Sequence, residues 1–161
     1  MKELMPQAER IAAILKARKE TVAVAEGSAG GLISAALLAV PGASEYFAGG
    51  GVIYTRNSLL RLMNVQEERI RGQPGGSESF ATLKAQIVRE HLSATWGLAE
   101  NGAAGPTGSR YGHAAGHSAM AVSGPIERAI TLETGSPDRL ANMYAFTAAT
   151  LRLFAEVLEA R

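Results

Sequence analysis

The first indication of the fold comes from residues 21–39, which have the sequence Thr21-Val-Ala-Val-Ala-Glu26-Gly-Ser-Ala-Gly-Gly31-Leu-Ile-Ser-Ala-Ala-Leu-Leu-Ala39. The segment 21–25 is short and apolar on both faces, which is typical of a strand buried between two layers of helices. It leads through a glycine-rich turn at 26–31 into the helical run 32–39, which Pro41 and Gly42 end. These residues predict a strand, turn and helix of an α/β protein.

Hydrophobic patterns on either side extend this unit over the whole chain. Apolar residues recur at helical spacing in the N-terminal segment, after Ser77 and near the C-terminus. The predicted helices are 4–18, 77–92 and a long helix from about Asp138, with short helical pieces between 58 and 76. The further predicted strands are 46–54, 95–99, 118–122 and 129–134, with a hairpin turn at Ser123-Gly-Pro125. We predict one domain, residues 1–161, with a three-layer α/β/α architecture around a mixed central sheet.

The composition excludes several classes of protein. The 161 residues are 47% hydrophobic and 19% charged, so the chain is long and apolar enough to form a core without disulfides. The net charge of +1 comes from interspersed signs, which argues against nucleic-acid binding. The longest apolar run, Leu32 to Val40, is far shorter than the roughly 20 residues of a membrane helix. With no cysteine present, we expect a cytoplasmic protein that binds no membrane.

The turn at 26–31 is the first candidate site. Small residues before a helix leave backbone N–H groups free to bind an anion, so Glu26, Gly30 and Gly31 are candidate ligand-binding residues. The turn lacks the lysine of a Walker motif and the spacing of a dinucleotide-binding motif. The alternative interpretation is a tight turn that lets the helix pack closely on the sheet.

Two further loops that follow predicted strands supply the other candidate site residues. In the first, the loop 102–109, the candidate ligand-binding residues are Gly105, Pro106, Thr107 and Gly108. Loops at the carboxyl ends of strands border the crevice in which open α/β sheets bind ligands, although Gly and Pro also simply shape a loop. We expect a small anionic polar ligand there if these loops converge with Ser28.

The third candidate loop is the segment 54–57, which offers the phenol of Tyr54 and the guanidinium of Arg56. Arg56 could bind a phosphate through two hydrogen bonds, or it could be an ordinary surface charge. His113 and His117 are four residues apart but lie in a glycine-rich segment without a glutamate of the HExxH type, so hydrogen bonding within the loop is the better interpretation. No pattern predicts a metal or a cofactor.

Four ordered motifs resemble the CinA C-terminal domain family, also known as the nicotinamide-nucleotide amidase family. They are the segments 21–34, 40–47, 50–54 and 102–108, and the resemblance extends over nearly the whole chain. It implies hydrolysis of the carboxamide of nicotinamide mononucleotide to nicotinic acid mononucleotide and ammonia. The amino-terminal, molybdopterin-binding-like domain of full-length CinA proteins has no counterpart here, so we expect a stand-alone form.

The resemblance also implies specific catalytic residues, and this chain departs from them. The family has a serine nucleophile directly after the glutamate of the first loop, a tyrosine at the end of the next strand, and a lysine five residues beyond it. The tyrosine is present as Tyr54, but Gly27 occupies the serine position and Leu59 the lysine position. Ala29 stands where the family has threonine.

These replacements shape the functional hypothesis. Ser28 could act as a shifted nucleophile with Tyr54, whereas the guanidinium of Arg56 stays protonated and cannot act as a base. We therefore expect a CinA-like protein that binds a small phosphorylated or carboxylated ligand, such as a pyridine mononucleotide, with altered or absent hydrolase activity. The alternative is a non-enzymatic interaction or regulatory domain. The family's tendency to associate and the apolar stripes of the terminal helices predict a homo-oligomer.

Overall fold

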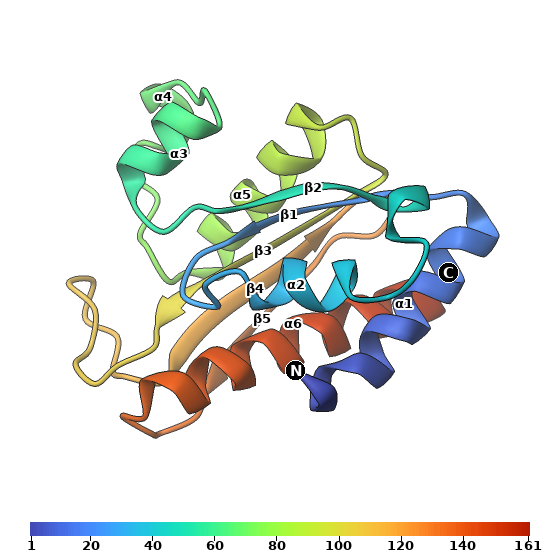
Figure 1. The fold of residues 1–161 in the computed structure, drawn as a ribbon. Helices are drawn as coiled ribbons and strands as arrows, with labels where there is room; N and C mark the ends of the chain where they lie inside the picture. The colour runs from blue at the N-terminus through green and yellow to red at the C-terminus, as the bar shows by residue number, and fades with distance from the viewer.

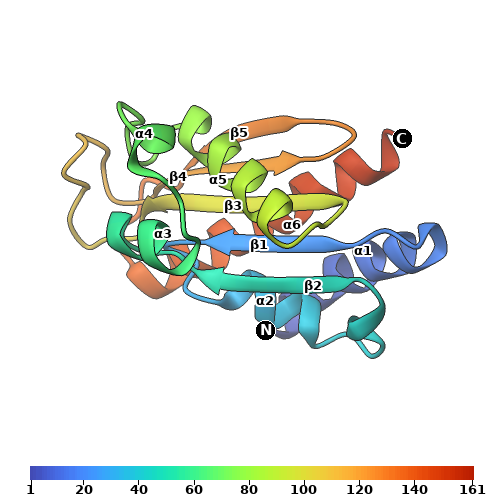
Figure 2. The same ribbon diagram turned by 90° about the horizontal axis from the view of Figure 1, so that it is seen from above.

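A five-stranded sheet forms the centre of the protein, with the strands in the order β2-β1-β3-β4-β5. We describe it from a computed structural model that covers residues 1–161. The strands are β1 (Val22–Glu26), β2 (Phe47–Val52), β3 (Trp96–Ala103), β4 (His117–Ser123) and β5 (Arg128–Glu133). β1 runs parallel to both β2 and β3, whereas β4 pairs antiparallel with β3 on one side and with β5 on the other (Figure 2). The prediction of a mixed sheet is confirmed.

Helices cover both faces of this sheet. They are α1 (Met5–Arg18), α2 (Leu32–Leu38), α3 (Arg56–Leu62), α4 (Glu67–Ile70), α5 (Glu78–His91) and α6 (Arg139–Glu159), with 3-10 turns at Lys2–Leu4 and Ala43–Glu45. α1, α2 and α6 pack together on one face, and α5 lies on the other (Figure 1). The three-layer α/β/α architecture predicted from the sequence is therefore confirmed.

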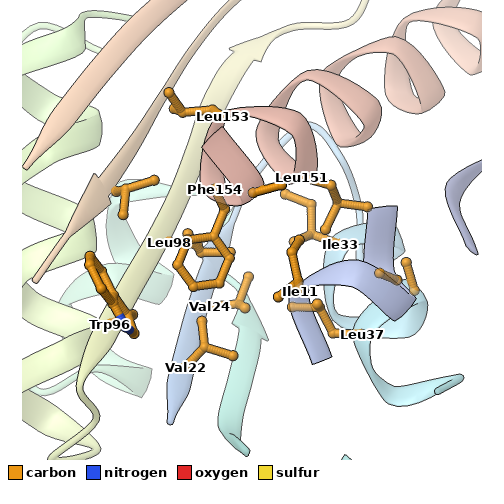
Figure 3. Packing of buried hydrophobic residues seen from close by; sticks show 14 of the residues in the cluster. Ile11, Val22, Val24, Ile33, Leu37, Trp96, Leu98, Leu151, Leu153 and Phe154 are labelled. Carbon is orange, nitrogen blue, oxygen red and sulfur yellow. The ribbon is translucent and has the colours of Figure 1, made fainter. Parts of the chain in front are cut away.

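The larger part of the hydrophobic core lies between the sheet and the layer of α1, α2 and α6 (Figure 3). Ile11 of α1 and Leu151 of α6 are fully buried there. The rings of Phe154 and Trp96 meet edge to face with their centroids 5.7 Å apart, which fixes α6 against β3. Because Trp96 is the first residue of β3, this contact anchors α6 at the amino end of the strand, away from the edge at which the cavity opens.

The opposite face of the sheet carries small residues, and α5 approaches it closely. Ala23, Ala99 and Ala121 are buried beneath this helix. A Cβ atom at Gly97 would lie 2.0 Å from the carbonyl oxygen of Ala85, so only glycine permits this contact between β3 and α5. The close approach brings side chains of α5 within reach of the strand ends.

β3 is longer than the sequence predicted. The strand continues beyond Ala99 to Ala103, because Asn101 and Gly102 pair in register with Ala119 and Ser118 of β4. A Cβ atom at Gly102 would lie 2.4 Å from the His117 carbonyl oxygen, so this glycine serves strand pairing rather than a loop. The expected hairpin between β4 and β5 is present.

No helix of the structure combines the length and the apolar character needed to cross a membrane.

Candidate functional site

A cavity of about 120 Å³ opens at the carboxyl ends of β1 and β3. Its wall comes from the turn after β1, the segment that follows β2, α5, the end of β3 and the loop before β4. Of the predicted site residues, Ser28, Tyr54 and Arg56 line this cavity. The chain thus brings three of the sequence candidates to one place, at the sheet edge where α/β proteins bind ligands.

The turn after β1 wraps around the buried carboxylate of Glu100. The N–H groups of Gly27 and Ala29 donate to its Oε2 atom at 3.2 and 2.7 Å. Its Oε1 atom accepts hydrogen bonds from the hydroxyl of Ser28 and, at 2.7 Å, from that of Ser118. All four of these donors belong to the protein itself, so the Glu100 carboxylate is fully hydrogen-bonded within the turn.

A second internal carboxylate, Glu26, fills the rest of the turn. It accepts hydrogen bonds from the N–H groups of Gly31, Ile33 and Ser34 at 2.9 to 3.0 Å and from the Ser34 hydroxyl at 2.6 Å. The N–H groups that the sequence suggested for an external anion thus already bind the protein's own carboxylates. Glu26, Gly30 and Gly31 lie outside the wall of the cavity.

Lys84, at the floor of the cavity, is the residue that the sequence analysis missed. Its side chain extends from α5, and the whole residue is only 2% exposed. The Nζ atom donates to the carbonyl oxygens of Glu100 at 3.1 Å and Ile53 at 3.4 Å. Burial lowers the pKa of Lys84 to about 8, and the negative charges of Glu100 and Glu26 oppose this shift.

A signal for Lys84 exists in the sequence. The residue shares one face of α5 with the small buried residues Ala81, Ala85 and Val88. A lysine within a buried helical face is uncommon, because burial of an ammonium group without a partner is costly.

Gly27 lies beside this lysine. A Cβ atom on Gly27 would stand 3.6 Å from Nζ of Lys84 and 3.2 Å from the carbonyl oxygen of Glu100. Leu59 is buried in the same wall. The two positions at which the resemblance implies a serine and a lysine thus both lie at this cavity, together with the amine of Lys84.

Tyr54 and Arg56 stand at the rim of the cavity. Tyr54 is 60% exposed, and its phenol oxygen lies 3.4 Å from a guanidinium nitrogen of Arg139. Arg56 forms an ion pair with Glu67 at 3.1 Å, and the preceding Thr55 caps the start of α3. Both side chains are accessible to a ligand that enters from solvent.

The Gly-Pro loop borders the cavity without forming its wall. None of Gly105, Pro106, Thr107 and Gly108 lines the cavity, whereas Gly102 and Ser109 on either side of them do. The Gly105 carbonyl accepts a hydrogen bond of 2.7 Å from Arg139. The loop is thus held to the start of α6.

The two histidines hold the opposite side of the entrance. Their rings stack in parallel with centroids 3.8 Å apart, and His113 lines the cavity. Nε2 of His113 and Nε2 of His117 bond to the carbonyl oxygens of Gly75 and Gly76, and Nδ1 of His117 contacts Glu133. This hydrogen bonding agrees with the role that the sequence analysis favoured. No group of three or more His, Asp or Glu residues is placed to hold a metal ion.

The lining of the cavity has a clear chemical character. It contains no aspartate or glutamate, and its basic residues besides His113 are Lys84 and Arg56. The aromatic rings of Tyr54, Phe80 and Tyr111 also contribute to it. Such a lining suits a flat ring that carries an acidic group.

Comparisons with known proteins agree with the resemblance seen in the sequence. The CinA C-terminal domain family matches residues 5–158. A CinA-like protein of Gloeobacter violaceus is 38% identical over 126 residues, which are 78% of this chain and 30% of that protein. A CinA-like protein of Desulforapulum autotrophicum is 33% identical over 77% of this chain and 29% of that protein. The chain thus spans about a third of the length of these curated relatives.

Solved structures show the same fold at lower sequence identity. A competence-damaged protein (CinA) superfamily protein of Klebsiella pneumoniae has a TM-score of 0.89 at 21% identity, over 98% of this chain and 99% of that one. A CinA superfamily protein of Enterobacter cloacae has a TM-score of 0.87 at 24% identity, over 96% and 92% of the two chains. At these identities the likeness concerns the fold alone.

Proposed function

Because the chain belongs to the CinA C-terminal domain family, we propose that its cavity binds a small phosphorylated or carboxylated molecule of the pyridine mononucleotide class. The proposal separates binding from the covalent hydrolysis that the family's serine implies. Binding uses the cavity lining, whereas hydrolysis by that route needs a hydroxyl group at position 27 that this chain lacks.

The charge of the lining is the observation that carries this proposal. Lys84 at the floor and Arg56 at the rim face a cavity without any carboxylate of its own. An anionic ligand gains from both cations, and a cationic ligand finds no counter-charge. Tyr54, Phe80 and Tyr111 add aromatic surface against which a pyridine ring can stack.

The contacts of Ser28 support binding rather than a shifted covalent route. Its hydroxyl donates to Glu100, and the residue is 4% exposed. A nucleophilic serine needs a neighbouring base that takes its proton, whereas the acceptor of the Ser28 hydroxyl, Glu100, already accepts hydrogen bonds from three other donors. Tyr54 accepts a hydrogen bond from Arg139 and stands at the exposed end of the cavity.

Thermal unfolding with nicotinamide mononucleotide and nicotinic acid mononucleotide tests the proposal. A ligand at 100 times its Kd adds about 2.7 kcal/mol of stability, which corresponds to a rise in Tm of about 5–10 °C for a chain of this size. We expect such a rise with at least one mononucleotide. Uridine monophosphate serves as the control, because it has the same phosphate on a different ring.

A parallel assay for released ammonia tests the second half of the proposal. We expect no turnover of nicotinamide mononucleotide above that of the buffer. Robust turnover that Ser28→Ala abolishes would contradict the proposal and establish a shifted nucleophile. Absence of any thermal shift with either mononucleotide would overturn ligand binding and favour a domain that binds a protein partner.

A further inference from the structure

Lys84 is a buried cation without an anionic partner in the fold. The ion pairs of the protein all involve other residues, so no carboxylate lies within 4 Å of Nζ. Buried charges in proteins are normally paired, because loss of hydration is otherwise not compensated. The two nearby carboxylates, Glu26 and Glu100, are already held by backbone N–H groups and hydroxyls.

The hydrogen bonds of Lys84 leave one donor unused. An ammonium group has three N–H donors. Two of them reach the carbonyl oxygens of Ile53 and Glu100, at 3.4 and 3.1 Å. No other acceptor of the protein bonds to Nζ, and Lys84 lines the cavity. The third N–H group is therefore available to a ligand.

Gly27 lies beside this donor. A Cβ atom at this position would stand 3.6 Å from Nζ and 3.2 Å from the carbonyl oxygen of Glu100, so a side chain there would crowd the ammonium group. Gly27 and Lys84 both line the cavity, so the ammonium group can be approached by a ligand atom from the cavity beside Gly27.

The number of donors at the floor distinguishes a carboxylate from a phosphate. One free N–H group matches one carboxylate oxygen, and the two carbonyl oxygens beside it would repel the several charged oxygens of a phosphate. The rim offers more donors, namely the guanidinium of Arg56 and the hydroxyl of Ser109. The phosphate of a mononucleotide therefore belongs at the rim and its ring substituent at the floor.

We propose that Lys84 binds the ring carboxylate of the ligand in the space beside Gly27, and that the protein thereby selects the acid form of a pyridine nucleotide over its amide. This inference rests on the proposed function and makes it more specific. A carboxylate supplies the counter-charge that Lys84 lacks, whereas a neutral carboxamide leaves the ammonium group unpaired.

The proposal also predicts that Lys84 takes up a proton when the acid form of the ligand binds. With a pKa of about 8, Lys84 is about half neutral at pH 8, and a carboxylate beside it favours the charged form. Binding of the acid at pH 8 should therefore take up about half a proton, and its affinity should fall by up to about tenfold per pH unit above that. The other titratable or charged groups around the cavity are Tyr54, Arg56, Tyr111 and His113, with Glu26 and Glu100 behind the turn.

Isothermal titration calorimetry of the whole chain with nicotinic acid mononucleotide and nicotinamide mononucleotide tests the inference. Titrations at pH 8 in buffers with different ionisation enthalpies give the number of protons taken up. For the wild type we expect at least tenfold tighter binding of the acid, with about half a proton taken up. Lys84→Met should lose this preference and the proton uptake, and Lys2→Met, an exposed N-terminal variant, should retain both.

The outcomes separate this inference from the proposed function. A folded Lys84→Met protein that still prefers the acid would overturn the role of Lys84 and leave ligand binding intact. Equal affinity of the wild type for the acid and the amide would also overturn the role of Lys84 while leaving ligand binding intact. Failure of the wild type to bind either mononucleotide overturns the proposed function, and the inference with it. The thermal unfolding transition of the variant establishes that it is folded.

Discussion

At the scale of single residues, a glycine beside a buried amine defines the site. A Cβ atom at Gly27 would lie 3.6 Å from Nζ of Lys84, which extends from α5. The resemblance implies a serine at position 27 and a lysine at position 59, whereas this chain has glycine and leucine there. Lys84 is therefore the amine of the cavity lining.

Replacement of Lys84 should change how stability depends on pH. The pKa of this lysine is lowered from 10.5 to about 8 in the folded chain, so between these values the unfolded chain holds more protons and stability rises with pH. The buried charge of Lys84 therefore lowers the free energy of unfolding by its full amount below about pH 8, and this loss becomes smaller as the pH rises. From pH 8 to 10 the wild type should gain about 2 kcal/mol relative to Lys84→Met.

Urea unfolding of both proteins across this pH range measures the effect. The difference between the two curves removes the contribution of all other titrating groups, including Tyr46, whose pKa is raised by burial. Parallel curves would show that Lys84 keeps an ordinary pKa.

Restoration of the serine should restore part of the chemistry. In Gly27→Ser the new hydroxyl is one bond from a Cβ atom 3.6 Å from Nζ, within hydrogen-bond reach of Lys84. We expect ammonia release from nicotinamide mononucleotide at least tenfold above the wild type, rising with pH as Lys84 becomes neutral.

Gly27→Ala is the matched control, because it introduces the same Cβ atom without the hydroxyl. Both variants place this atom 3.2 Å from the Glu100 carbonyl oxygen, so both should be slightly destabilised. The prediction fails if the folded serine variant is no more active than the alanine variant. A second change, Lys84→Met, should remove any gained activity.

The sequence did not predict the buried charged residues of the site. Ser28, Tyr54 and Arg56 could be predicted as candidates because each follows a predicted strand, and the structure brings the three to one cavity. Lys84 and Glu100 could not be predicted, because each interrupts an apolar helix face or strand and resembles a surface residue in the sequence. Their role emerges only when α5 is packed against β3 through Gly97.

At the scale of elements, the turn between β1 and α2 is an anion-binding loop that the protein fills by itself. Glu26 accepts three backbone N–H groups at the start of α2, and Glu100 accepts two more from the turn. The glycines indicated N–H groups free to bind an external anion, whereas in the structure these groups bind the protein's own carboxylates. The sequence could not reveal this, since Glu100 is 73 residues from Gly27.

Neutralisation of Glu26 should therefore destabilise the fold. Each hydrogen bond to a charged group contributes about 1.5–3 kcal/mol, and glutamine presents an N–H group to donors that need an acceptor. We expect Glu26→Gln to lower the free energy of unfolding by about 3 kcal/mol in urea titrations. Glu9→Gln on the exposed surface of α1 should change it by less than about 0.5 kcal/mol. A loss of similar size in the two variants would contradict the capping role.

Element boundaries were predictable where a turn or cap marked them. Ser77 accepts a hydrogen bond from the N–H group of Phe80 and Asp138 one from that of Ala141, as their positions before helical runs indicate. The end of β3 was not predictable in this way, because Asn101 and Gly102 have the composition of a loop and are extended only by pairing with β4.

At the scale of the whole molecule, the sheet and its two helix layers place every wall of the cavity. The parallel strands β1 and β3 end at the same edge, α5 brings the lysine from one face, and the segment after β2 brings the rim (Figures 1 and 2). This arrangement followed from the alternation of strands and helices in the sequence. The expected association into homo-oligomers stays a prediction.

The central claim is that this cavity holds a small acidic molecule against Lys84. An NMR titration of the ¹⁵N-labelled protein with nicotinic acid mononucleotide tests it most directly, with glycine amides as reporters. The account predicts saturable shifts for the lining residues Gly27, Gly75, Gly76 and Gly102, and none for Gly42 and for Gly124, which lies against Trp96 at the opposite end of β3. An unchanged spectrum, or shifts confined to residues outside the cavity, would contradict it.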